Sequence, residues 1–422
     1  MKQELSVNTR SLPLWVLALV LASLPVLSLA QGTTPAKAGF SVQRLQQVNQ
    51  FVDRQIKAGE ISGGVTLVAR NGHIVHLQAQ GVSDLASRAP MQKDSLFRIA
   101  SMTKPVVATA VLMLVEEGRL RLDDPVSRFI PSFRDVQVAV PRAARAGAPT
   151  GQSVPGHYTV PADRALTVLD LLTHTGGLVS GPVSTAAAQK IMDRRRAEGI
   201  KVLDELAGVP LEFQPGTRWA YSGLAGFELL GRIVEIAAQQ RFGDFLQQRI
   251  FKPLGMKDAT FWPSDAQRAR LVTNYVLGEQ GIALNPDPDR LNTPVLDSGG
   301  GGLISSAESY ARFAMMLANG GELDGVRLLS PATVKLMGSQ VISDALPGRR
   351  AGEGYGLGVR HVNDRAARHT LLSNGSYGWS GAYGTHFWID PSQHLVAILM
   401  VQTPGQQRTD DFETAVMQAL VE

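Results

Sequence analysis

The chain has 422 residues, of which 44% are hydrophobic and 18% charged, and it contains no cysteine. This is the composition of a globular protein with a full hydrophobic core, and without cysteine its stability must come from packing rather than disulfides. The net charge of +4 is spread along the chain, and no basic patch is interleaved with aromatic residues, which argues against a nucleic-acid groove.

The first thirty residues differ from the rest of the chain. Lys2 and Arg10 precede an uncharged, mostly apolar stretch from Ser11 to Ala30, which ends in small residues. This order predicts a secretory signal peptide over residues 1–30 and a flexible leader over 31–39. The alternative is an uncleaved membrane anchor, because about 20 apolar residues can span a bilayer. We therefore expect an exported protein, periplasmic or secreted, which contacts a membrane only if this segment is retained.

The next elements are a helix and a hairpin. Apolar residues recur at helical spacing from Ser41 to Lys57, which predicts a helix. Two runs rich in β-branched residues within 63–81 flank Asn71-Gly72, and this dipeptide predicts a tight hairpin turn. A second helix is expected over 103–117, because a glycine follows the apolar run at position 118.

The middle and the end of the chain differ in character. Residues 141–165 hold four prolines and three glycines, which predicts a long loop. Helical segments are expected at about 166–173, 185–207 and 224–240. A glycine-rich turn at 299–302 precedes another helix, strands follow within 355–362 and 384–402, and a helix over about 409–420 ends the chain.

This order of elements predicts an α+β fold. The two ends of the chain would share one mainly antiparallel sheet flanked by helices, with a helical insertion between them. We expect a catalytic domain over 40–422, with a sheet lobe at about 40–125 and 290–422 and an all-helical lobe at about 126–289.

One pair of residues at the start of the second helix could carry chemistry. Ser101 and Lys104 are three residues apart, so their side chains lie on the same helix face. A serine there can attack a carbonyl while helix N–H groups stabilise the developing oxyanion, and a lysine with a lowered pKa can take its proton. The alternative is a serine that caps the helix beside a lysine that points to solvent.

Two further segments could complete such a site. Tyr221 follows a proline- and glycine-containing loop and could share the proton of the lysine, although a half-buried turn tyrosine is the simpler interpretation. Trp379-Ser380-Gly381-Ala382 leads toward a strand, and an edge strand beside a cleft could supply the backbone N–H of Ala382 to an oxyanion. The alternative is an aromatic, glycine-rich turn.

Taken together, these segments resemble the penicillin-recognising serine hydrolases, and most closely the family VIII carboxylesterases, which are similar to class C β-lactamases. The resemblance covers about residues 40–422 and rests on five segments in the same order: "FRIASMTKPVVATA", "LLTHTGGL", "PGTRWAYSG", "GGGGLISSAESYARF" and "WSGAYGTHFWIDP". It implies a β-lactamase/transpeptidase-like fold with a sheet lobe beside an all-helical lobe.

The resemblance also implies roles for individual residues. Ser101 would be the nucleophile, Lys104 its proton acceptor, and Tyr221 the partner base and later the acid for the leaving alcohol. The N–H groups of Ser101 and Ala382 would form the oxyanion hole. Substrate contacts are expected from these residues: Gly223, Trp379, Ser380 and Gly381.

Two departures from the family pattern bear on the substrate. Tyr221-Ser222-Gly223 lacks the asparagine of the Tyr-x-Asn motif, and Trp379 replaces the lysine of the Lys-Thr-Gly motif. Both changes favour neutral esters over anionic β-lactams. We therefore expect a carboxylesterase acting on short- to medium-chain esters. The alternatives are a β-lactamase or D-Ala-D-Ala carboxypeptidase and a non-catalytic penicillin-binding-like module.

Other motifs are weaker. The chain has no Gly-x-Ser-x-Gly sequence, which is the signature of the nucleophile-elbow esterases. His174 is interpreted as a structural turn residue rather than part of a catalytic triad. His73 and His76 should point to opposite faces of a strand, which makes a metal site improbable. The sequence indicates no cofactor or metal, and it leaves the oligomeric state open.

Overall fold

The structure is a computed structural model, and it describes residues 33–142, 154–279, 281–286, 296–405 and 407–422. The described residues belong to one compact unit, Thr33–Glu422. The predicted signal peptide lies outside them, so it stays a prediction. Within the described ranges, no helix has the length and apolarity that crossing a bilayer requires.

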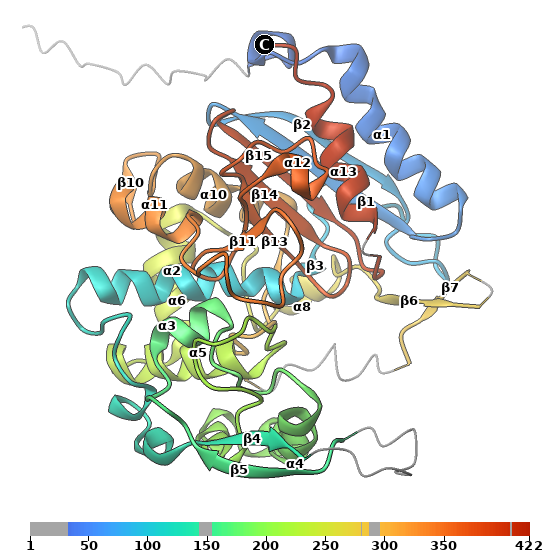
Figure 1. The fold of residues 1–422 in the computed structure, drawn as a ribbon. Coiled ribbons are helices and arrows are strands. Elements are labelled where there is room, and N and C mark those ends of the chain that lie inside the picture. The colour runs from blue at the N-terminus through green and yellow to red at the C-terminus, as the bar shows by residue number, and fades with distance from the viewer. Residues whose placement is uncertain (1–32, 143–153, 280, 287–295, 406) are drawn as a thin grey trace, which may run out of the picture. The chain divides into compact units, whose positions relative to one another are not determined.

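A seven-stranded antiparallel sheet is the centre of the fold (Figure 1). Its spatial order is β11-β12-β13-β14-β15-β1-β2, so strands from both ends of the chain pair with each other at β15 and β1. The strands have these bounds: β1 Gly63–Arg70, β2 His73–Gly81, β11 Glu353–Tyr355, β12 Arg360–Val362, β13 Tyr377–Ser380, β14 His386–Asp390 and β15 Leu395–Met400. The predicted shared sheet is confirmed.

The first hairpin forms where the sequence predicted it. Asn71 and Gly72 both have positive φ, 52° and 77°, as a two-residue turn between twisted strands requires. The turn joins β1 to β2, and β1 also pairs with β15 along its length.

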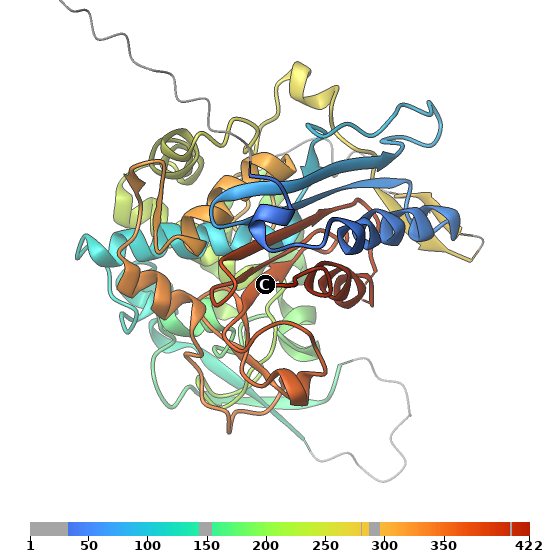
Figure 2. The same cartoon turned by 90° about the horizontal axis from the view of Figure 1, so that it is seen from above.

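Helices cover both faces of the sheet. In β15, Leu395, Ala397 and Leu399 contact the apolar cluster under α1 and α13, while Val396 and Ile398 belong to the core on the other face. Alternate residues of a strand point to opposite faces, which explains why a strand buried on both sides is apolar throughout. Figure 2 shows α1 and α13 side by side on their face of the sheet.

The helices follow the predicted order. Their bounds are α1 Val42–Lys57, α2 Thr103–Glu116, α3 Val168–Thr173, α4 Pro182–Glu198, α5 Ala225–Ala238, α6 Phe242–Leu246, α7 Lys252–Leu254, α8 Asp265–Arg268, α10 Ala307–Ala318, α11 Pro331–Gly338, α12 Arg365–Arg368 and α13 Gln407–Met417. Short 3-10 or π-helical turns cover η1 Ala36–Ala38, η2 Ala100–Met102, η3 Val126–Arg128, η4 Pro131–Asp135, η5 Ile200–Gly208 and η6 Gln247–Phe251.

The helix-rich segment differs from the prediction in two places. Residues expected in the loop form β5 (His157–Pro161), which pairs with β4 (Gln137–Pro141), and the part of that loop over 143–153 lies outside the described residues. A second hairpin joins β6 (Tyr275–Gly278) to β7 (Gly281–Leu284). The described residues of the segment 126–289 are therefore mainly, not wholly, helical, because two pairs of short strands form within it.

Two smaller predictions also need correction. The helix expected over 185–207 divides at Gly199, which has φ 78°, into α4 and η5. The strand expected over 355–362 is a tight hairpin of β11 and β12. The remaining two-stranded pairs are β3 (Phe97–Arg98) with β8 (Ile304–Ser305) and β9 (Glu322–Leu323) with β10 (Val326–Arg327).

The start of α3 is held by a buried carboxylate. Asp170 and Thr167 form a reciprocal capping box, and Asp170 also accepts from Arg164 at 2.6 and 2.8 Å and from the Thr175 hydroxyl at 3.0 Å. The side chain of Asp170 is 3% exposed. One buried group therefore fixes both ends of this helix.

We expect the Asp170→Ala substitution to lower the free energy of unfolding by about 2 kcal/mol, because it leaves buried donors without an acceptor. Urea unfolding followed by circular dichroism measures the change. Asp163→Ala is the matched control, since Asp163 is an exposed acidic residue in the segment that leads into α3. Equal losses in the two variants would contradict the assignment.

Candidate active site

Ser101 lies in a strained turn at the start of the most buried helix. Ala100, directly before it, has a positive φ of 45°, a conformation that non-glycine residues adopt only when the surrounding structure imposes it. Ser101 itself is half-buried and lines a cavity of about 630 Å³. The strained turn thus brings the hydroxyl to the surface of a helix that is otherwise enclosed.

The Lys104 side chain is fully buried one turn further along α2. Its amine lies 3.0 Å from Ser101 Oγ and donates to the backbone carbonyls of Gly223 and Gly300, each at 2.7 Å. Burial lowers the pKa of Lys104 to about 7, against the opposing effect of the buried Glu228 carboxylate. A charged amine is costly to bury, so these surroundings favour the neutral form of the amine.

This geometry suits a neutral amine. An unprotonated lysine has two N–H hydrogens, which the carbonyls of Gly223 and Gly300 accept, and one lone pair. The lone pair then faces Ser101 Oγ, the third neighbour of the amine. Lys104 is therefore placed to receive the hydroxyl proton of Ser101.

Tyr221 contacts the same hydroxyl from the other side. Its Oη donates to Ser101 Oγ at 2.8 Å, and the Lys104 amine lies 5.1 Å from the centre of its ring. Burial raises the pKa of Tyr221, although the hydrogen bond with Ser101 acts in the opposite direction. The structure thus brings Ser101, Lys104 and Tyr221 together, and their catalytic roles stay predictions.

A glycine contact sets the position of the β13–β14 turn opposite Ser101. A Cβ on Gly381 would clash with the backbone carbonyl oxygen of Ile99, so a larger residue does not fit there without a shift of the backbone. Thr385 Oγ1 donates to the same carbonyl at 3.1 Å. The turn that carries Ala382 is therefore fixed against the segment that carries Ser101.

The predicted oxyanion donors are both available. In the part of the chain that the structure describes, neither the N–H of Ser101 nor that of Ala382 has an acceptor, and both residues line the cavity. Two N–H groups of residues that line the same cavity can together stabilise the negative charge of a tetrahedral intermediate. This role stays a prediction.

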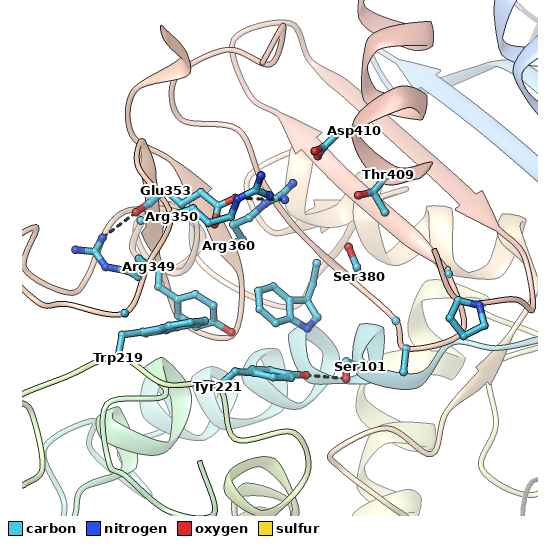
Figure 3. A pocket seen from close by; sticks show the side chains of 18 of the residues that line it. Ser101, Trp219, Tyr221, Arg349, Arg350, Glu353, Arg360, Ser380, Thr409 and Asp410 are labelled. Atoms are coloured by element: carbon cyan, nitrogen blue, oxygen red, sulfur yellow. Dashed lines mark hydrogen bonds and ion pairs between the residues drawn. The ribbon is translucent and has the colours of Figure 1, made fainter. Parts of the chain in front are cut away.

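Aromatic side chains form one wall of the cavity (Figure 3). The ring centres of Trp379 and Tyr221 are 5.4 Å apart, those of Trp379 and Tyr355 also 5.4 Å, and those of Tyr355 and Trp219 5.6 Å. Figure 3 shows Arg349, Arg350 and Glu353 on the side of this wall away from Ser101. The surroundings of the serine are therefore mainly apolar.

Gly223 lies beside the lysine, and its predicted contact with a substrate stays a prediction. Its carbonyl holds the Lys104 amine, and it is not among the described residues that line the cavity. Trp379, Ser380 and Gly381 do line it, and their contact with a substrate stays a prediction.

His174 supports the loop of Tyr221. It ends α3 with a positive φ of 57°, its carbonyl accepts from Ala220 N–H at 3.1 Å, and its Nδ1 accepts from Ser222 N–H at 3.3 Å. Its ring meets that of Tyr221 edge-on, with centres 4.8 Å apart. Burial holds the pKa of His174 well below its usual value, so it acts as a structural residue, as predicted.

Some residues of the site were not found from the sequence. Gly300 was interpreted only as a close backbone approach, whereas its carbonyl holds Lys104. Glu228 was missed, although an acidic residue in the first turn of the apolar helix α5 is a usable signal. Trp219 and Tyr355 complete the aromatic wall, and no local motif marks them.

His76 bonds Thr66 at 2.8 Å, and the described residues contain no cluster suited to a metal ion.

Known proteins match this chain over nearly its whole length. A family model described as Beta-lactamase matches residues 48–421. Protein Rv1367c of Mycobacterium tuberculosis is 38% identical over 375 residues, which cover 84% of this chain and 89% of that protein. Esterase EstB of Burkholderia gladioli is 31% identical over 405 residues, which cover 89% and 94% of the two chains.

Two further matches are more distant. A protein of Escherichia coli K12 with the provisional name D-alanyl-D-alanine carboxypeptidase is 27% identical over 419 residues, which cover 92% of this chain and 88% of that protein. The solved structure of EstCE1, described as a hydrolase with promiscuous acyltransferase activity, superposes with a TM-score of 0.73 at 23% identity. That match covers 89% of this chain and 99% of the EstCE1 chain and concerns the fold alone.

We expect the rate at which a fluorophosphonate labels Ser101 to rise with pH and to level off above about pH 8, because Lys104 must be neutral to take the proton. The activating form is lost as the pH falls through the Lys104 pKa of about 7. Intact-mass spectrometry measures the labelling rate, with Ser101→Ala as the blank. A rate that does not change between about pH 6 and 10 would contradict the role of Lys104.

Proposed function

The chain belongs to the beta-lactamase family, and from that premise we propose that it is a carboxylesterase that cleaves neutral short- to medium-chain esters. The observation that carries the proposal is the hydrogen-bonded group of Ser101, Lys104 and Tyr221 beside an aromatic wall. A lysine with a pKa near neutrality can activate a serine toward an ester carbonyl.

The proposed reaction has two halves. Ser101 Oγ attacks the ester carbonyl as its proton passes to Lys104, and the N–H groups of Ser101 and Ala382 stabilise the oxyanion. The carbon–oxygen bond to the alcohol then breaks, Tyr221 donates a proton to the departing alcohol, and Lys104 returns a proton to Tyr221. Water attacks the acyl-enzyme by the same route in reverse and releases the acid and free Ser101.

The surroundings of the nucleophile support a neutral substrate. Trp379 stands where the family pattern has a lysine, and its ring packs against Tyr221 rather than presenting a charge. Two of the three arginines that line the cavity are engaged: Arg360 bonds Glu413 at 2.6 Å, and Arg349 bonds the backbone carbonyl of Glu353 at 2.9 Å. The third, Arg350, is exposed, and Figure 3 shows it on the side of the aromatic wall away from Ser101. A carboxylate beside the scissile bond would therefore meet an indole.

Action on β-lactams or D-alanyl peptides is the second candidate. It is favoured by the Escherichia coli relative and by the serine, lysine and tyrosine that acylation of a lactam would also use. It differs from the first candidate in needing a cation for the substrate carboxylate.

We expect kcat/KM for p-nitrophenyl butyrate to exceed that for a chromogenic cephalosporin by orders of magnitude, because Trp379 stands where the family pattern has the lysine that would meet the carboxylate of a lactam. Spectrophotometric assays of both substrates, with Ser101→Ala as the blank, measure the ratio. A higher value for the cephalosporin would assign the protein as a lactamase.

A positive charge introduced at position 379 tests the reason for the expected preference for esters over cephalosporins. We expect Trp379→Lys to raise the ratio of cephalosporin to ester turnover by about tenfold or more, the size of a charge-assisted hydrogen bond. Trp219→Lys is the matched control, because Trp219 belongs to the same wall but does not occupy the position of the motif lysine. The same gain in both variants would show that any added cation suffices and would contradict the role of position 379.

A further inference from the structure

Glu228 is an acidic residue of the core that contacts neither the nucleophile nor the cavity. Its side chain comes from the first turn of α5 and is 0% exposed, and it is not among the described residues that line the cavity. A carboxylate is costly to bury unless its oxygens and its charge find partners. The surroundings of Glu228 therefore indicate what the residue does.

The two oxygens of Glu228 have different surroundings. Oε1 accepts from the hydroxyl of Ser298 at 2.5 Å and lies 3.4 Å from Nη1 of Arg195 on α4, a contact without a hydrogen bond. Oε2 has no hydrogen-bonding partner among the described residues. Buried oxygens without a partner are uncommon in native proteins and call for an explanation. An ion pair that only joined α4 to α5 would be expected to use both oxygens in direct hydrogen bonds.

The hydrogen bond with Ser298 ties Glu228 to the turn that holds the lysine. Ser298 directly precedes the glycine-rich turn at 299–302, and its carbonyl accepts from the N–H of Gly302 at 2.9 Å. Within this turn the carbonyl of Gly300 accepts from the Lys104 amine at 2.7 Å. The carboxylate therefore anchors the first residue of a turn whose centre contacts the catalytic lysine.

The same turn packs directly on the start of α5. A Cβ on Gly300 would lie 2.9 Å from backbone atoms of Leu224, so the two backbones approach closely. The residue before it, Gly223, supplies the second carbonyl that accepts from the lysine amine. The contact between α5 and the glycine-rich turn thus holds both carbonyls, and the hydrogen bond from Ser298 to Glu228 fastens this contact.

The proposed reaction changes the charge of the lysine. When Lys104 takes the hydroxyl proton of Ser101, its amine becomes an ammonium, while the serine oxygen bonds the carbonyl carbon and the negative charge moves to the oxyanion. Burial disfavours such an ammonium, and Glu228 acts against burial by raising the pKa of Lys104. The carboxylate is therefore a source of negative charge on the side of the lysine away from the cavity.

Other titratable groups face this pair in the part of the chain that the structure describes. Arg195 on α4 faces the carboxylate and offsets part of its charge. Tyr221 and His174 face the lysine, and both are neutral near pH 7, because burial raises the pKa of Tyr221 and holds that of His174 well below its usual value. Glu228 is thus the anion that acts on Lys104.

We propose that Glu228 is a positioning residue for Lys104. Through Ser298 it holds the carbonyl of Gly300 against the lysine amine, and its charge stabilises the ammonium that forms when this amine takes a proton. The inference rests on the proposed reaction at Ser101 and deepens it, because it names the group that makes the lysine a sufficiently strong base.

The pH profile of fluorophosphonate labelling at Ser101 tests the charge of Glu228. Glu228→Gln removes the charge and keeps an oxygen that can accept from Ser298. Loss of a nearby anion favours the neutral amine down to lower pH, so the midpoint of the profile should fall by about 1 pH unit. The plateau rate should fall by about 3- to 10-fold, because a weaker base activates the serine less. Intact-mass spectrometry measures both quantities.

Two further variants separate the charge from the hydrogen bond. Ser298→Ala keeps the charge and removes the bond, so the plateau rate should fall by about 3-fold or more while the midpoint stays at the wild-type value. Glu235→Gln is the matched control, because Glu235 is an acidic residue of the same helix that pairs with Arg232 at 3.0 Å. It should change neither quantity.

Thermal unfolding midpoints show which variants fold. Glu228→Met is a second neutral variant, because an apolar side chain of similar length is often tolerated in place of a buried charge. It should lower the midpoint of the labelling profile as Glu228→Gln does.

Four results would overturn the proposal. An unchanged labelling midpoint in a folded neutral variant would reject the role of the charge, and so would an equal fall of the midpoint in Ser298→Ala. An unchanged plateau rate in Ser298→Ala would reject the positioning of the Gly300 carbonyl. Wild-type protein that is not labelled at Ser101 would reject the proposed function together with this inference, whereas the first three results reject the inference alone.

Discussion

The amine of Lys104 is buried, and its three hydrogen-bonding neighbours are oxygen atoms of Ser101, Gly223 and Gly300. Every residue from Thr103 to Leu114 is buried, so α2 carries a lysine through the centre of an apolar core. A buried amine favours its neutral form, whereas the buried Glu228 carboxylate favours the charged one. The balance of these two effects places the Lys104 pKa near neutrality, where the lysine can act as a base.

The rest of the fold brings other groups to this amine. The glycine-rich segment before β8 is tied to the start of α2 at Leu303, whose N–H bonds Thr103 and whose carbonyl accepts from Ile99, and this sets the Gly300 carbonyl beside the lysine. The seven-stranded sheet supplies the opposite wall, where Gly381 packs against Ile99. The site therefore forms where a buried helix start meets the end of β13, and residues far apart in sequence must fold together before it exists.

The sequence predicted the regular parts of the fold because their signals are local. The helical spacing over 41–57, the Asn71-Gly72 turn and the glycine after α2 each fix an element without reference to distant residues. The β4–β5 pair was missed because its second strand lies in a stretch of prolines and glycines. The motifs around Ser101, Tyr221 and Trp379 located the site, whereas the position of the Gly300 carbonyl beside Lys104 depends on tertiary contacts that no local pattern records.

A measurement of the pKa of the Lys104 amine is the most direct test of its role as the base for Ser101. Lysines labelled with carbon-13 at Cε would be followed by NMR across a pH range, and the resonance missing from Lys104→Met identifies the residue. The account predicts a titration near the Lys104 pKa of about 7, well below the ordinary lysine value of about 10.4. If the Lys104 resonance does not titrate below about pH 10, the amine is charged at neutral pH. The lysine could then not accept the proton of Ser101, and its role as the base would be contradicted.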